Sequence, residues 1–167
     1  IGRINRPEAY NLFFRKHRPL IERALRYEVD ERLLVSGEVF KPLLESEMAA
    51  LGDRMEAEGV EAIAIMFMHS YRNPAHEAAA KAYFSRRFPH LFVSASHELS
   101  QEYREYERTS TIAANAYIGP RVSSYLTEIV DHLAAKKFAG GFLIVQSTGG
   151  LYDAEAAGRE CIRMLES

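Results

Sequence analysis

The middle of the chain alternates continuous apolar runs with stretches of helical periodicity. Residues 62–68 are apolar throughout, which is typical of a strand covered on both faces. Asn73 and Pro74 form a helix cap and a first helical position, and Pro89 ends the helix that they open. A second apolar run follows at residues 91–94. The order strand, helix, strand predicts a right-handed βαβ unit, so the predicted fold class is α/β.

A hairpin and a helix are predicted before this unit. Residues 25–30 alternate apolar with charged side chains, the pattern of a half-buried strand. A second short run at residues 38–43 follows a serine-glycine pair, so the two runs predict a β-hairpin. From about Glu45 the spacing becomes helical, and Gly59 supplies the usual helix stop. The apolar face of this helix consists of Leu44, Met48, Leu51 and Met55.

A long helical connection is predicted after the second strand. Residues 109–118 predict one helix, and Pro120 predicts the start of another that ends at the glycine pair 140–141. The second helix has a predicted buried stripe of Val122, Tyr125, Leu126, Ile129, Val130 and Leu133. Residues 142–146 predict a third buried strand.

Composition narrows the classes of function. The 167 residues are close to one domain in size, and their net charge of −2 argues against general nucleic-acid binding. The longest apolar run, residues 62–68, is far shorter than the ~20 residues of a membrane span. Cys161 is the single cysteine, which excludes an internal disulfide and fits a reducing cytoplasm. Because Ile1 replaces an initiator methionine, we expect an internal piece of a longer polypeptide.

The common catalytic signatures give little support to a metal site or a nucleophile. His69, His76 and His97 lie near predicted strand ends or helix starts, but no two histidines have the i, i+4 spacing of a zinc helix. No metal is therefore expected, and local hydrogen bonds account for these histidines. Ser147 lacks the spacing of a nucleophile elbow. Cys161 is predicted to be a buried structural thiol on a helix.

Polar residues and glycines follow the third predicted strand. They are Gln146, Ser147, Thr148, Gly149 and Gly150. Ligands of open α/β sheets bind at the carboxyl ends of strands, which makes this segment a candidate ligand contact. The alternative is a strand-to-helix turn that simply needs glycine.

The densest polar segment spans residues 101–111. Such clusters are usually solvated faces with weak ion pairs. Tyr103 and Tyr106 lie three positions apart beside Arg104 and Arg108, which also suits a partner-binding surface. Both interpretations stay open at the level of the sequence.

Several short strings keep one order and spacing along nearly the whole chain. They are Gly2-Arg3, Asn5-Arg6-Pro7, and residues 27–32, 69–77, 96–98, 104–111, 115–117 and 146–150. In this combination the chain resembles the hydantoinase A/5-oxoprolinase family, which includes N-methylhydantoinase A and the β subunits of acetone carboxylases. Thr148 is a departure, because the family typically has asparagine there.

The resemblance implies part of an actin-like ATPase fold of the ribonuclease H-like type, with βαβ units and a long helical connection. Residues 1–100 correspond to the C-terminal part of the family's N-terminal domain, and residues 101–167 to the start of its main domain. The two parts are expected to form one compact unit.

The resemblance also implies an ATP-dependent hydrolase that opens cyclic amides such as hydantoin, N-methylhydantoin or 5-oxoproline. ATP and magnesium would serve the full-length protein, and a hydantoinase B-type subunit or domain would be its partner. Two alternatives are a β-type subunit of an ATP-dependent ketone carboxylase and a non-enzymatic docking module that uses the surface at Tyr103, Arg104 and Tyr106.

The family's two phosphate-binding loops are expected before Ile1 and after Ser167. We therefore expect the 167 residues alone to bind no cofactor tightly and to be inactive. His69, Asn73 and Arg108 join Gln146–Gly150 as candidates for positioning a substrate, nucleotide or partner. No residue receives a catalytic assignment.

Overall fold

The structure, a computed structural model, describes residues 10–15 and 19–165. Gly2-Arg3 and Asn5-Arg6-Pro7 lie outside the described residues. The elements are η1 (Arg23–Leu25), β1 (Arg32–Leu33), β2 (Val39–Lys41), α1 (Glu45–Ala57), β3 (Ala62–Ile65), α2 (Ala75–Arg87), β4 (Phe92–Ala95), α3 (Ser96–Leu99), α4 (Glu105–Ala135), β5 (Leu143–Val145), β6 (Leu151–Asp153), α5 (Ala154–Arg159) and η2 (Cys161–Met164).

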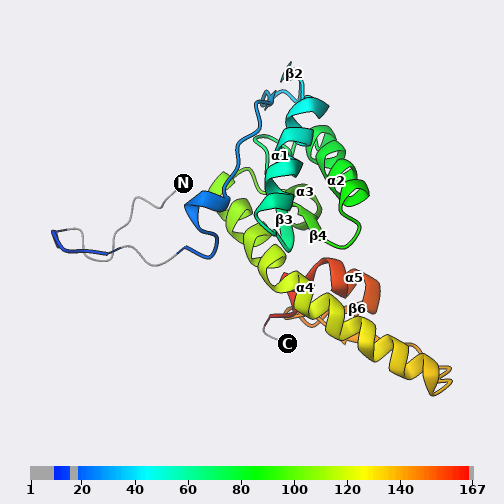
Figure 1. Ribbon diagram of the computed structural model, residues 1–167. Helices are drawn as coiled ribbons and strands as arrows, with labels where there is room; N and C mark the ends of the chain where they lie inside the picture. The colour runs from blue at the N-terminus through cyan, green and yellow to red at the C-terminus, as the bar shows by residue number, and fades with distance from the viewer. Residues whose placement is uncertain (1–9, 16–18, 166–167) are drawn as a thin grey trace.

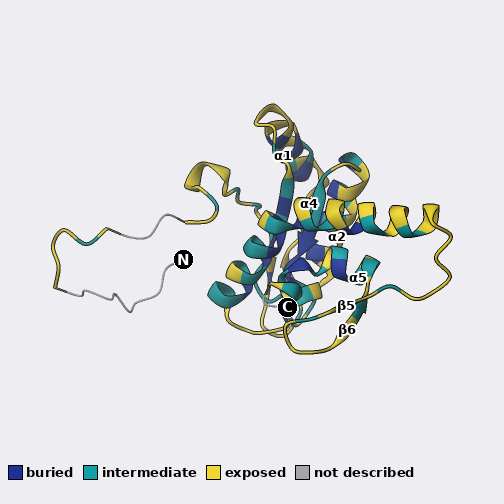
Figure 2. Cartoon of the chain, turned by 90° about the horizontal axis from the view of Figure 1, so that it is seen from below, coloured by how far each residue is buried: buried dark blue, intermediate teal, exposed yellow. Residues whose placement is uncertain are grey.

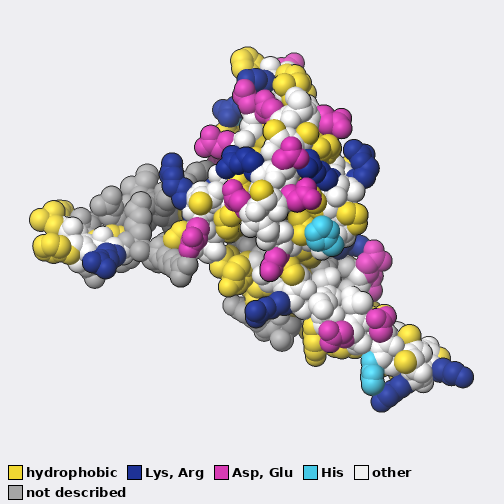
Figure 3. Space-filling model, in the orientation of Figure 1, with side chains coloured by type: hydrophobic (Ala, Val, Ile, Leu, Met, Phe, Trp, Pro, Cys, Tyr) yellow, Lys and Arg dark blue, Asp and Glu magenta, His cyan; other side chains and the backbone are white. Residues whose placement is uncertain are grey.

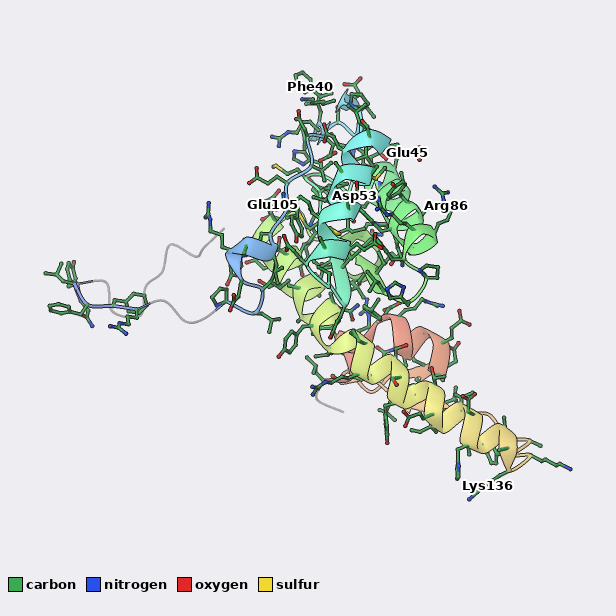
Figure 4. The ribbon with its side chains drawn as sticks, viewed as in Figure 1. Phe40, Glu45, Asp53, Arg86, Glu105 and Lys136 are labelled. Atoms are coloured by element: carbon green, nitrogen blue, oxygen red, sulfur yellow. The ribbon has the colours of Figure 1, made fainter. Side chains whose placement is uncertain are left out.

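Helix α4 crosses the molecule and supports the other elements. It packs against β3 and β4 along its first half, and against α5 and η2 farther along (Figure 1). Figure 4 shows the helix running from Glu105 to the far end of the molecule, where Lys136 is labelled. No helix in the described part of the chain has the length and apolar character needed to cross a membrane.

The predicted βαβ unit is confirmed. Strands β3 and β4 pair in parallel from Ala62 opposite Phe92 to Ile65 opposite Ala95, and α2 connects them. Helix α2 begins one residue later than predicted, because Pro74 is its N-cap and Ala75 its first residue. Asn73 precedes the cap and accepts a hydrogen bond from the Ala75 amide at 3.0 Å. The parallel pairing places the carboxyl ends of both strands at one edge.

The main core lies between this unit and α1. Its buried residues are Met48, Met55, Ile63, Ile65, Ala80, Phe84, Phe88 and Ala95. The predicted α1 face is confirmed at Met48 and Met55, which are buried, and at Leu51, which packs against the core. It is wrong at Leu44, the N-cap residue, which is 45 % exposed. Gly59 has a φ of +66°, a left-handed conformation that suits glycine just after a helix.

The predicted strand at residues 25–30 is wrong. This segment follows η1 in an extended form, and the hairpin strand is β1, which pairs antiparallel with β2. The alternating pattern has another cause, because Tyr27 packs on the core and its hydroxyl bonds Glu58 of α1. The Asp30 amide also donates to Glu47 of α1, at 2.9 Å.

The prediction of two helices meeting at Pro120 is also wrong, because α4 is continuous through this residue. Proline removes one intrahelical hydrogen bond, at a typical cost of about 3 kcal/mol, so packing along α4 must outweigh the local preference. The predicted buried stripe is confirmed only at Leu126, and Tyr125 and Val130 are exposed. The last turns of α4 extend beyond α5, as their exposed residues in Figure 2 show.

The third predicted buried strand is an exposed hairpin instead. β5 pairs antiparallel with β6, and the side chains of Leu143 and Val145 are 55 % and 51 % exposed. Helix α4 ends at Ala135, before the glycine pair, and Lys137 takes the left-handed conformation with a φ of 55°. An apolar run of this length does not distinguish a buried strand from an exposed one.

Replacing Phe84 with alanine should lower the free energy of unfolding by about 3–5 kcal/mol, because the ring fills the core. The matched control is Phe40→Ala on β2. Phe40 is 72 % exposed and lies at the periphery in Figure 4, so its loss should cost less than about 0.5 kcal/mol. Urea titrations measure both values. Equal losses for the two variants would contradict this description of the core.

Candidate functional site

The carboxyl ends of β3 and β4 lead into two neighbouring segments. β3 continues into residues 66–74, here named the β3–α2 loop, and β4 continues directly into α3. This is the edge at which ligands of open α/β sheets bind. The candidate site is therefore built from the β3–α2 loop and the side chains that fix it.

Glu77 of α2 holds the β3–α2 loop in place with a fully buried carboxylate. It accepts hydrogen bonds from the Phe67 amide at 2.7 Å, from the Ser96 hydroxyl at 2.7 Å and from the His97 amide at 2.9 Å. The His97 ring nitrogen Nδ1 lies 2.8 Å from the same carboxylate. One side chain thus joins the segments that follow both strands.

Arg108 of α4 fixes the loop from the other side and is also fully buried. Its guanidinium donates to the Ser70 hydroxyl at 2.8 Å and to the Phe67 carbonyl at 2.7 Å. The Tyr71 ring covers it, with the ring centre 5.5 Å from Cζ. Its Nε is buried without a hydrogen-bond partner.

A short chain of hydrogen bonds connects the buried cation to the buried anion. The hydroxyls of Ser70 and Ser96 lie 3.4 Å apart, and each bonds one of the charged groups. Burying two charges is costly unless both are paired or hydrogen-bonded. Here Arg108 donates several hydrogen bonds, Glu77 accepts several, and the two are linked through these serines, which compensates part of that cost.

Asn115 ties α4 to the C-terminal elements. Its amide nitrogen donates to the Ser94 hydroxyl at 2.9 Å and to the Arg159 carbonyl at 3.0 Å. Its amide oxygen accepts from the Ile162 amide at 3.0 Å. This fully buried residue therefore joins β4, α5 and η2 to one point of α4.

His69 sits at the turn of the β3–α2 loop in a left-handed conformation, with a φ of 60°. Its carbonyl accepts from the amides of Arg72 at 2.9 Å and Asn73 at 3.1 Å. The ring meets Tyr71 edge-on at 6.0 Å, and Nδ1 is buried without a hydrogen-bond partner. Left-handed backbone is costly for residues with a side chain, so this turn is strained.

Asn73 holds the other end of the same loop. While its amide oxygen accepts from the Ala75 amide, its amide nitrogen donates to the Gly37 carbonyl of the β1–β2 hairpin at 2.8 Å. The structure therefore gathers the predicted candidates His69, Asn73 and Arg108 around one loop. Glu77, Ser96 and Asn115 were not among the predicted site residues, because nothing in the sequence shows that they are buried.

The segment Gln146–Gly150 forms the turn of the β5–β6 hairpin, which is neither a strand-to-helix turn nor part of the β3–β4 edge. The Gln146 amide donates to the Gly150 carbonyl at 2.8 Å, and Gly149 has a φ of +86°. Ser147 donates to the Arg163 carbonyl of η2 from both its amide and its hydroxyl, each at 2.8 Å. Thr148 is exposed. Gln146–Gly150 thus forms a second polar region, fixed on η2.

Of the residues in the predicted partner surface, Arg108 does not lie on the surface. Tyr103 is 63 % exposed, and the Arg104 Nε donates to its hydroxyl at 3.3 Å. Tyr106 is half-buried, and Arg108 is fully buried beneath the β3–α2 loop. The spacing that placed Arg108 beside the tyrosines missed its inward position. On the face in Figure 3, acidic and basic side chains alternate over α1 and α2 instead of gathering by sign.

Two histidines pair with carboxylates. His76 Nδ1 lies 2.6 Å from Glu31, and His97 contacts Glu77 as described above. Across residues 10–15 and 19–165, no group of three or more histidine, cysteine and acidic side chains could hold a metal ion.

Cys161 is buried, as predicted. Its thiol donates to the Gly158 carbonyl at 3.1 Å. Burial raises the pKa of this thiol to about 11, because the thiolate would lose its hydration. A thiol in this environment is a poor nucleophile at neutral pH.

Sequence profiles identify the family from both halves of the chain. The profile of the hydantoinase/oxoprolinase N-terminal region matches residues 1–88, and a second profile, hydantoinase/oxoprolinase, matches residues 108–167. The chain belongs to the hydantoinase/oxoprolinase family. The resemblance seen in the sequence strings is therefore confirmed.

Two relatives of this chain are much longer than it is. An uncharacterized protein of Methanocaldococcus jannaschii is 41 % identical over 167 residues, which cover 100 % of this chain and 25 % of that protein. The caprolactamase subunit alpha of Pseudomonas jessenii is 38 % identical over 135 residues, which cover 79 % of this chain and 19 % of the subunit. The hydantoinase/oxoprolinase chain described here thus spans a quarter or less of their length.

Solved structures support the α/β class. The ATP-dependent caprolactamase of P. jessenii matches with a TM-score of 0.77 and 34 % identity over 87 % of this chain and 21 % of its own. A nucleotide-free acetone carboxylase matches with a TM-score of 0.80 and 25 % identity, over 92 % of this chain and 22 % of its own.

Glu77→Gln should lower the free energy of unfolding by about 3 kcal/mol. A carboxamide has one acceptor oxygen, so its NH₂ group must face one of the backbone amides that Glu77 now accepts from. Glu155→Gln is the matched control, because the ion pair between Glu155 and Arg159 is exposed and should contribute less than about 0.5 kcal/mol. Urea titrations compare the variants, and a neutral Glu77→Gln would contradict the role given to this carboxylate.

The alkylation of Cys161 by iodoacetamide should remain slow at pH 8 and keep rising up to about pH 11, following the raised pKa of the thiol. The same protein unfolded in urea should instead level off near the ordinary thiol pKa. By linkage, the buried thiol stabilises the fold below that ordinary pKa, and the contribution is lost as the pH rises through about 11. A plateau near pH 9 in the folded protein would refute this assignment.

Proposed function

We propose that the complete protein uses MgATP to open a cyclic amide of the hydantoin, N-methylhydantoin or 5-oxoproline class. The observation that carries this proposal is membership of the hydantoinase/oxoprolinase family, supported by similarity to a protein named as an ATP-dependent caprolactamase. A ring amide resists attack by water, and phosphorylation of its oxygen makes the carbon a better electrophile. ATP supplies that phosphoryl group.

The β3–α2 loop is proposed to line the substrate side of the site. It lies at the ligand-binding edge of the β3–β4 pair, and buried charges on α2 and α4 hold its backbone in place. The Gln146–Gly150 turn is proposed as a second contact for substrate or nucleotide. Its exposed hydroxyls and its glycine at positive φ suit close approach to a ligand.

A hydantoinase B-type subunit or domain is the proposed partner. Relatives named as the caprolactamase subunit alpha and the acetophenone carboxylase gamma subunit support a multi-subunit arrangement. The exposed Tyr103 and Arg104, with Tyr106, form the proposed contact surface. We also propose that the N-terminal and main domains meet at residue 100, and that the protein is cytoplasmic.

ATP-dependent carboxylation of a ketone is the second candidate function. It is favoured by the structural match to acetone carboxylase over 92 % of this chain. Both reactions activate an unreactive carbonyl with ATP, so the same edge could serve either one.

The experiment measures phosphate release by the protein expressed from its complete gene, together with its B-type partner. The panel contains hydantoin, N-methylhydantoin, 5-oxoproline and caprolactam, and acetone with bicarbonate tests the second candidate. We expect one cyclic amide to stimulate release at least about tenfold, because substrate binding commits ATP to the ring oxygen. Stimulation by acetone with bicarbonate alone would favour the carboxylase. No stimulation by any compound would favour a docking role.

A further inference from the structure

His69 combines three features that a purely structural turn residue does not need. It lies in the β3–α2 loop after the carboxyl end of β3, its φ is 60°, and its Nδ1 is buried without a hydrogen-bond partner. Asparagine or glycine would occupy a left-handed turn at lower cost. Strain of this kind persists where the surrounding structure imposes it, and it is concentrated at functional sites.

The surroundings explain how the strain is maintained. Glu77 and Arg108 hold the Phe67 peptide just before the turn, and Asn73 fixes the residue at which α2 begins. The His69 ring is half-buried against Tyr71, and rotation about its two side-chain bonds would carry Nδ1 out of the turn. The loop thus presents an imidazole whose ring nitrogen has no role within the described fold.

The chemistry of the proposed reaction requires a proton acceptor. When the amide oxygen attacks the terminal phosphorus of ATP, the new O–P bond forms as the bond to ADP breaks. The nitrogen–hydrogen electron pair then becomes the C=N bond of the activated ring, and the proton must leave. Imidazole is the side chain that takes up protons near neutral pH.

We propose that His69 accepts the ring N–H proton of a cyclic amide through Nδ1. This inference rests on the proposed function and assigns a residue to one of its steps. Of the charged groups in the network, Glu77 is already saturated by four contacts, and Arg108 cannot accept a proton.

The test uses His69→Gly in the protein expressed from its complete gene, with its partner subunit. Caprolactam and 5-oxoproline are the probes, and lactam-stimulated phosphate release is measured beside ATP hydrolysis without lactam. We expect the stimulated kcat/KM to fall about 100-fold or more, the usual effect of losing a general base. Millimolar imidazole should restore part of the loss by occupying the vacated space.

Two further variants separate chemistry from strain. Lys137→Gly removes the other non-glycine residue with positive φ among the described residues, at the far end of α4. Both glycine variants should raise Tm, but only His69→Gly should lose stimulated release. His69→Asn tolerates the left-handed turn without supplying a base, so it should fold, lose stimulation and gain less from imidazole than His69→Gly does.

The outcomes are distinct. Full stimulated release by His69→Gly overturns the inference and leaves the proposed function standing. A loss that imidazole does not restore, accompanied by a lower Tm, assigns His69 a structural role and also overturns it. If the unaltered protein shows no stimulation by any cyclic amide, the proposed function and this inference fail together.

Discussion

The backbone of Phe67 is hydrogen-bonded from two sides, and the geometry of the candidate site depends on these two bonds. Its amide donates to the buried carboxylate of Glu77, and its carbonyl accepts from the buried guanidinium of Arg108. The two charges come from helices on separate parts of the chain, α2 and α4. Phe67, which follows β3, can therefore take up its position only when both helices are packed on the β3–β4 pair. Removing either charged group would leave its own buried hydrogen-bond partners unsatisfied.

This arrangement makes α4 more than a connection between two regions. Arg108 lies in its first turn and fixes the β3–α2 loop, whereas Asn115, two turns later, fixes α5 and η2 through backbone groups. Ser147 of the β5–β6 turn in turn donates to the Arg163 carbonyl of η2. The two polar regions that the sequence pointed to are thus attached to one rigid element, although they do not belong to one edge.

Patterns along the sequence correctly predicted the elements whose burial follows from local periodicity. The β3–α2–β4 order is confirmed, and so is the α1 face apart from the exposed Leu44. The start of α2 is confirmed to within one residue. The patterns failed where tertiary contacts decide. Residues 25–30 alternate because Tyr27 docks on α1, and the apolar run at 142–146 is an exposed hairpin strand. At the site, the sequence named His69, Asn73 and Arg108 but not Glu77, because burial of a charged side chain leaves no mark on local spacing.

The hydrogen bonds around the β3–α2 loop also explain how the strained backbone of His69 is maintained. A left-handed histidine would relax if the neighbouring backbone were free to move. Here the residues on both sides are fixed, by Glu77 and Arg108 before the turn and by Asn73 after it. The buried network thereby holds the imidazole of His69, whose Nδ1 has no hydrogen-bond partner, in the loop that follows β3. A rigid support beneath an unsatisfied polar group is the arrangement that binding and proton transfer require, because it fixes geometry before the ligand arrives.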